Sequence, residues 1–246
     1  MERPGYEEFS ALRSAFRDKV REWSTAVPDL WSLQERLRDA RGYDDYAVET
    51  PVVYNRALDD IGPDSRPRWI LIADNPGKNE QKTANLRYLV GQSGKLAEGF
   101  FRRELGTDFR SEVLIINKTP VHTPKTAELA LLRGMDATGA VDTLLAESQV
   151  WMAGFARALH RVLGIPVWIS GRSELKPRGI FGPWFAEFSR LYRGAPEAAR
   201  QEVLVFNHFS MNQFSVELAR KRDPSKPLIE ELRRIGAENR RAVFGF

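Results

Sequence analysis

The stretch WILIADNPG, residues 69–77, decides the fold that we predict for this chain. Its first five residues, Trp69–Ala73, are apolar and are followed at once by the turn-forming residues DNPG. The apolar run shows no alternation of polar and apolar residues, as expected of a strand that is buried on both faces of a sheet. We therefore predict an inner strand of a parallel sheet at residues 69–73, with a polar loop beginning at Asp74.

Three more short apolar runs have the same character, at residues 113–116, 167–169 and 203–206. Helical patterns lie between or after them, notably at residues 95–105, 141–163 and 227–243. Alternation of strands and helices is typical of a parallel sheet with helices on both faces. The predicted fold class is α/β, as a three-layer α/β/α arrangement with a central four-stranded parallel sheet.

The first part of the chain has a different pattern. Apolar residues recur at intervals of three and four over residues 6–23, and a second helix is expected from Pro28 to about Gly42. A turn-rich segment at residues 59–68 then precedes the first strand. We predict a helical extension at residues 1–67, packed on a main domain at residues 68–246.

Composition excludes several kinds of site. The 246 residues include no cysteine, which excludes disulfides, thiolate zinc sites, iron–sulfur clusters and a cysteine nucleophile. Three histidines are too few for a dense histidine metal site. No run of about 18 apolar residues is present, and the first 30 residues do not resemble a signal peptide. We expect a cytoplasmic, intracellular protein with no metal, no cofactor and no membrane partner. The sequence does not determine the oligomeric state, for which a monomer is the expectation.

Charge is distributed unevenly along the chain. Residues 1–68 carry 11 basic and 14 acidic side chains, whereas residues 69–246 carry 26 basic and 19 acidic ones. The main domain is therefore basic, which suits a partner that bears phosphates. The excess is modest and is also found in proteins that bind no nucleic acid.

Polar residues follow every predicted strand. Asp74 and Asn75 follow the first and Asn117 the second, Ser170-Gly171-Arg172 follow the third, and Asn207-His208-Phe209-Ser210 follow the fourth. Because ligands bind at the carboxyl ends of parallel strands, these residues are predicted to form one site. The sequence holds no P-loop, no G-x-G-x-x-G and no H-E-x-x-H motif.

The motifs at these strand ends resemble those of the uracil-DNA glycosylase superfamily. ADNPG, residues 73–77, resembles the G-x-N-P-G signature of its mismatch-specific and single-strand-selective branches, and YLVGQSGKL, residues 88–96, resembles P-F-V-G-x-x-G-x-L of its thermophile-type branch. VLIIN, residues 113–117, resembles the superfamily's strand ending in asparagine, and HFS, residues 208–210, its closing H-P-S. The resemblance covers about residues 68–215 and implies a metal-independent enzyme that removes a deaminated base from DNA.

By this resemblance, Asn75 holds the attacking water, with Asp74 beside it, and His208 stabilises the departing base anion. Asn117 would read the base edge, because one carboxamide offers both a donor and an acceptor. The further base-binding positions would be Gly77, Tyr88 and Leu89. The DNA-binding positions would be Gly91, Ser93, Arg172, Ser210 and Met211.

DNA contacts are also expected after His208 and near the end of the chain. Either Met211 or Phe214 would insert into the base stack when a nucleotide is extruded, or both side chains belong to the core. The basic side chains of Arg220, Lys221, Arg222, Arg240 and Arg241 would meet backbone phosphates, or they form a solvated helix face.

The chain departs from the family pattern at several positions. Leu89 replaces the base-stacking phenylalanine, Phe209 replaces the proline of H-P-S, and Ala73 replaces the first glycine. The four cysteines that hold the thermophile-type iron–sulfur cluster are missing. Two alternatives to a DNA glycosylase therefore remain open: a non-catalytic nucleic-acid-binding protein of the same fold, and an enzyme that acts on a free nucleoside or another small ligand.

Overall fold

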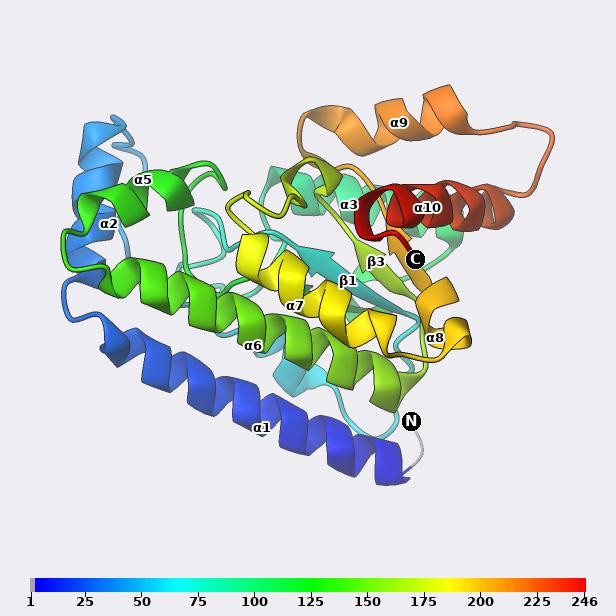
Figure 1. Cartoon of the computed structure of the whole chain (residues 1–246), viewed down its shortest axis with the longest axis horizontal. Helices are drawn as coiled ribbons and strands as arrows, with labels where there is room; N and C mark the ends of the chain where they lie inside the picture. Colours follow the sequence, from blue (N-terminus) through cyan, green and yellow to red (C-terminus); the bar gives the residue numbers. More distant parts are fainter. Residues whose placement is uncertain (1–2) are drawn as a thin grey trace.

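The computed structural model describes residues 3–246 and contains the four predicted strands (Figure 1). They are β1 (Trp69–Ala73), β2 (Val113–Asn117), β3 (Val167–Ile169) and β4 (Val203–Val205). All three strand pairs are parallel, and the strands lie in the order β2-β1-β3-β4. The prediction of a four-stranded parallel sheet is confirmed, and β1 occupies an inner position between β2 and β3.

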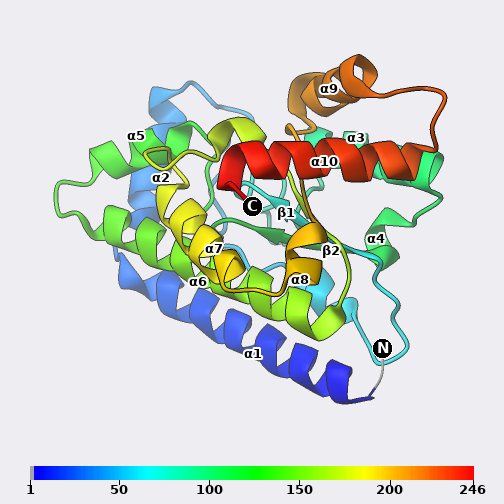
Figure 2. The same ribbon diagram turned by 45° about the vertical axis from the view of Figure 1, so that its right-hand side comes forward.

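Helices cover both faces of this sheet, as a three-layer α/β/α arrangement requires (Figures 1 and 2). Their bounds are α1 Arg3–Ala26, α2 Leu30–Ala40, α3 Gln92–Leu105, α4 Phe109–Glu112, α5 Glu128–Met135, α6 Ala140–Leu163, α7 Gly182–Arg193, α8 Glu197–Gln201, α9 Gln213–Lys221 and α10 Leu228–Phe244. Three short 3₁₀ turns lie at Arg56–Asp60, Arg172–Glu174 and Ser210–Asn212.

Successive residues of β1 point to opposite faces of the sheet and enter two different cores. Ile70 and Ile72 pack in a core that contains apolar residues of α1, α2, α5, α6 and α7. Trp69 and Leu71 pack in a second core with residues of α3, α4, α9 and α10. Each fully buried side chain of this size stabilises the fold by roughly 1.5–3 kcal/mol. Burial on both faces explains why the strand sequences are continuously apolar.

The N-terminal helices share the first of these cores. Helix α1 runs alongside α6 on the side away from the sheet in both views (Figures 1 and 2). Phe16 and Trp23 of α1 both pack against the ring of Trp151, at centroid distances of 5.6 and 5.7 Å. Apolar packing is therefore continuous across the expected boundary at residue 67.

Two glutamines attach the N-terminal segment to the loops at the strand ends. Gln34 donates to the backbone oxygens of Pro51 and His122 at 3.1 and 2.8 Å. Gln81 donates to Ala47 O and accepts from the backbone N–H of Glu49, at 2.9 and 2.6 Å. Both glutamines are buried, so the segment fixes the loops that follow β1 and β2. No helix in residues 3–246 combines the length and the apolar character that crossing a membrane requires.

Candidate functional site

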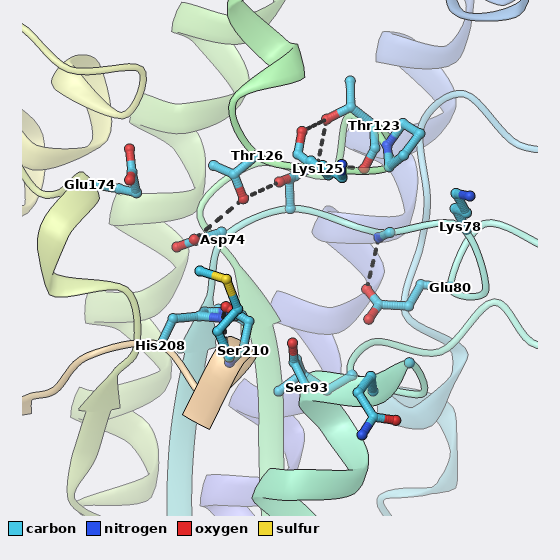
Figure 3. Close-up of a pocket in the computed structure, with 18 of the residues that line it drawn as sticks. Asp74, Lys78, Glu80, Ser93, Thr123, Lys125, Thr126, Glu174, His208 and Ser210 are labelled. Carbon is cyan, nitrogen blue, oxygen red and sulfur yellow. Dashed lines mark hydrogen bonds between the residues drawn. The ribbon is translucent and has the colours of Figure 1, made fainter. Parts of the chain in front are cut away.

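A cavity of about 560 Å³ opens at the carboxyl ends of the strands (Figure 3). It brings together most of the residues that the sequence singled out. The lining includes Asp74, Asn75, Gly77, Leu89, Gly91, Ser93, His208, Ser210 and Met211. In Figure 3, Asp74, Thr126 and His208 lie toward one end of this cavity, and Lys78 and Glu80 lie toward the other.

Asp74 is the first residue after β1, and it forms a buried ion pair. Its Oδ1 accepts a hydrogen bond from Lys118 Nζ at 2.5 Å, and the same ammonium donates to Ser170 O at 2.7 Å. The Asp74 side chain is 8% exposed, whereas that of Lys118 is fully buried. The carboxylate therefore reaches the cavity, and its counter-ion lies behind it.

Asn75 is engaged on both sides of its amide. Its Nδ2 donates to Thr123 Oγ1 at 3.0 Å and to Thr123 O at 3.2 Å. Its Oδ1 accepts from Thr126 Oγ1 at 3.0 Å, and the same hydroxyl lies 3.4 Å from Asp74 Oδ2. Asn75 thus ties residues 123–126 to the end of β1, with one lone pair of its carbonyl oxygen left for water.

His122 supports the loop that contains Asn75 and Pro76. Its ring is fully buried, and Nδ1 lies 2.9 Å from Pro76 O. Because a carbonyl oxygen only accepts, Nδ1 carries the proton. Burial lowers the pKa of His122 to about 4, so the ring is neutral at pH 7. It acts as a structural donor to the Asn-Pro-Gly turn.

His208 presents a different hydrogen-bonding pattern. Its Nδ1 accepts from the backbone N–H of Ser210 at 3.0 Å and lies 2.7 Å from Ser210 Oγ. Burial lowers the pKa of His208; Lys118 also lowers it, while Asp74 and Glu174 oppose the shift. The ring is therefore neutral at pH 7 with its proton on Nε2, which donates to none of the described residues. A neutral donor at this position suits a ligand that gains negative charge.

Glu80 is a further carboxyl group of the lining. It is 7% exposed, and its Oε2 accepts from Gly77 N at 3.3 Å. Burial raises the pKa of Glu80 to about 7, against backbone hydrogen bonds from Gly77, Leu89 and Val90 that favour the ionised form. Glu80 links the loop after β1 to the segment that contains Leu89.

Three of the predicted site residues lie outside the lining. Tyr88 is buried and donates its hydroxyl to Val53 O at 2.6 Å. Asn117 is 1% exposed, and neither atom of its amide has a hydrogen-bond partner among the described residues. Arg172 donates to Asn239 Oδ1 at 2.7 Å and lies 3.6 Å from Glu217. Leu89, by contrast, lines the cavity with a left-handed φ of 52°.

Two of the expected DNA contacts are wrong. Phe214 is 1% exposed and packs edge-on against Phe100 at 4.8 Å, so it cannot enter a base stack. Arg240 is 5% exposed and donates to the backbone oxygens of Arg200 and Val203. In both cases the side chain fills space between α9 or α10 and the sheet. Met211, by contrast, is 82% exposed.

Sequence reasoning missed Lys118, Glu80, Thr123 and Thr126. Lys118 directly follows Asn117, so its place at the end of β2 was a usable signal. Parallel register then puts it beside Asp74, because Ala73 pairs with Asn117. The two threonines lie in a loop without regular structure, and no spacing rule places them near Asn75.

No group of three or more His, Asp or Glu side chains in residues 3–246 is arranged to hold a metal ion. The polar groups around the cavity are instead amides, hydroxyls, an imidazole, two lysine ammonium groups and the carboxyl groups of Asp74, Glu80 and Glu174. Comparison of the sequence with models of known protein families and with curated proteins found no match.

Proposed function

We propose that this protein is a DNA glycosylase that hydrolyses the N-glycosidic bond of uracil or a related deaminated base. One observation carries the proposal: a carboxylate, Asp74, and a neutral imidazole N–H donor, His208, line one cavity at the carboxyl ends of the strands. Its volume of about 560 Å³ lies within the ordinary range for small-molecule sites and admits a nucleoside.

The reaction requires two kinds of stabilisation. The bond between the sugar and the base breaks through a sugar with cationic character, and the base leaves with the bonding electrons. Asp74 and Asn75 supply oxygen atoms for the water and negative charge near the sugar. His208 Nε2–H supplies a hydrogen bond to the base as its charge develops. The order of polar residues along the strands supports this assignment through the superfamily resemblance.

DNA binding is supported by the loop after β4. Met211 has a left-handed φ of 49° and projects an apolar side chain that is 82% exposed. An apolar wedge of this kind compensates for the base that is extruded from the stack. Lys78 and Lys125 also line the cavity and can meet phosphates near its opening.

A second function is favoured by a specific observation. Asn117, which the resemblance assigns to the base edge, lies outside the lining with its amide buried. A chain whose base-reading amide does not reach the cavity fits a nucleic-acid-binding protein that has lost catalysis. An enzyme for free nucleosides is the remaining alternative, and it would show no dependence on DNA.

The test is strand nicking after alkali treatment, with single- and double-stranded oligonucleotides that carry uracil, hypoxanthine or xanthine. The wild-type protein and its His208→Ala variant are compared at equal concentration. Release by the wild type that is lost in the variant supports the glycosylase. Binding without release, weakened by salt, supports the non-catalytic alternative, since contacts to phosphates are salt-dependent. Release only from free nucleosides supports an enzyme that acts on free nucleosides.

A further inference from the structure

Lys118 is a fully buried lysine beside a cavity that it does not line. Lysine is seldom buried unless it is paired, and here its ammonium donates to Asp74 Oδ1 and to Ser170 O. The ammonium also lies 5.1 Å from the ring centroid of Phe181. Because Lys118 does not line the cavity, its hydrogen bond to Asp74 is the contact through which it orients a group that does.

The pair is built from three strand ends. Asp74 follows β1, Lys118 follows β2 and Ser170 follows β3. The backbone N–H of Lys118 donates to Ala73 O at 2.9 Å, which fixes where its side chain begins. At Gly171, which has a φ of 85°, a Cβ atom would lie 2.5 Å from Asp74 Oδ1. Glycine at this position therefore leaves the room that the carboxylate needs.

Asp74 has more capacity for a ligand than Asn75 has. The Nδ2 of Asn75 is used by Thr123, and its Oδ1 accepts the Thr126 hydroxyl at 3.0 Å. That hydroxyl has a single proton and lies farther from Asp74 Oδ2, at 3.4 Å. The proton therefore serves Asn75, and Oδ2 of Asp74 is left to accept from a molecule in the cavity.

We propose that Asp74 is the group that polarises the attacking water and that Lys118 is a positioning residue that orients this carboxylate. The role rests on the proposed glycosylase function. The water oxygen bonds to C1′ of the sugar while the bond from C1′ to the base nitrogen breaks. Asp74 Oδ2 accepts the water proton, the bonding electrons leave with the base, and Lys118 keeps its proton throughout.

The experiment is a double-mutant cycle with Asp74→Asn, Lys118→Met and the double variant, measured as single-turnover base release. Removal of a group that takes a proton lowers the rate by about 10²–10⁴-fold. We expect Asp74→Asn to fall in this range. Lys118→Met should lose at least about tenfold, because the carboxylate remains but is no longer held in its orientation. The double variant should be about as slow as Asp74→Asn alone, because Lys118 orients a carboxylate that this variant no longer has.

Two further variants keep the test decisive if Lys118→Met does not fold. Lys118→Arg retains the charge but moves it, so the protein should fold and release base more slowly than the wild type. Arg234→Met is the matched control, since Arg234 pairs with the buried Glu231 on α10, away from the cavity. It should lower the melting temperature and leave the rate of release unchanged.

Chemical rescue separates a catalytic role of Asp74 from a structural one. Added formate should restore release to Asp74→Ala, because Lys118 holds the small carboxylate in the vacated place. The same formate should not restore release to Asp74→Ala/Lys118→Met. Three results would each overturn the proposal. They are wild-type rates in Lys118→Met or Lys118→Arg, losses that multiply in the double variant, and rescue that does not need Lys118. Absence of release by the wild type would instead overturn the proposed function on which it rests.

Discussion

The loop after β1 and the loop after β4 supply the two halves of the candidate site, and they are built in opposite ways. In the first, Asp74 and Asn75 are held by Lys118, Thr123 and Thr126. In the second, the ring of His208 bonds, among the residues that the structure describes, only to Ser210 of its own loop. The first loop is a fixed frame that orients its groups through distant parts of the chain, whereas the second is a local turn.

Backbone geometry shows the same difference. Met211 and Asn212 both have left-handed φ angles, 49° and 58°, which are uncommon for residues other than glycine. In the loop after β1, residues 74–80 contain no left-handed residue, and left-handed φ angles occur only farther along it, at Leu86 and Leu89. Strain of this kind persists where a segment has a role in contact with a partner. We therefore expect variants in the first loop to change both stability and rate, and variants in the second to change rate alone.

Asn75→Ala should have the largest effect. The variant removes the hydrogen bonds that tie residues 123–126 to β1, so release should fall by about 10³-fold or more, combining the loss of water orientation with that of the frame. The free energy of unfolding should fall by about 1–3 kcal/mol, because the two threonine hydroxyls lose their partner. Denaturant unfolding measures the change in stability, and single-turnover kinetics measure the change in the rate of release. An unchanged stability would contradict the view of this loop as a frame.

His208→Ala should reduce release by about 10²–10³-fold, the range for loss of one donor to a developing anion. Its free energy of unfolding should change by less than about 1 kcal/mol, since the ring bonds only within its own loop. His122→Ala is the matched control, because that ring is buried and bonds to Pro76 O. A large loss of stability in His208→Ala would remove the contrast between the two loops.

The titration of Glu80, which lies in the loop after β1, should make the free energy of unfolding depend on pH. Burial raises the pKa of Glu80 to about 7 in the folded protein. Between about pH 4.5 and 7 the unfolded chain therefore loses this proton while the folded chain keeps it, and the free energy of unfolding falls by up to about 3 kcal/mol.

Glu80→Gln removes this titration, so the variant should lose less stability than the wild type as the pH rises from 4.5 to 7. Urea unfolding at several pH values gives the comparison. Parallel pH profiles for the two proteins would show that Glu80 does not titrate in this window.

Met211→Ala should have the smallest effect. The side chain is 82% exposed, so stability should change by less than about 0.5 kcal/mol. Release from duplex DNA should fall by about tenfold, because extrusion costs a few kcal/mol and the wedge offsets part of it. Release from single strands should change less. Equal losses on both substrates would exclude Met211 as a wedge.

The sheet was predictable because a strand that is buried on both faces has a continuously apolar sequence. Each strand is a short run of apolar residues with polar residues directly after it, and β1 and β3 have the predicted bounds. β2 extends one residue farther, through Asn117, and β4 ends one residue earlier, at Val205. Helices α4, α5, α7, α8 and α9 were not predicted. All but α7 have at most nine residues, which is too short for a clear helical period.

The site was predictable where residues follow a strand directly and less so elsewhere. Asp74 and His208 line the cavity because each follows a strand at its carboxyl end. Asn117 was expected to follow its strand, but it is the last residue of β2 and its side chain is buried within the sheet. Glu80 and Thr126 were not found, because loops bring them to the cavity without a periodic pattern.

The packing of α1 on α6 has a consequence during synthesis. About 110 residues separate the end of α1 from the start of α6. At translation rates of about 5–20 residues per second, roughly 6–20 s pass before the partner helix emerges. During that interval Phe9, Phe16 and Trp23, which are at most 2% exposed in the finished fold, lack the α6 surface on which α1 packs. The nascent chain therefore presents an aromatic stripe for several seconds, the form that chaperones for apolar segments recognise.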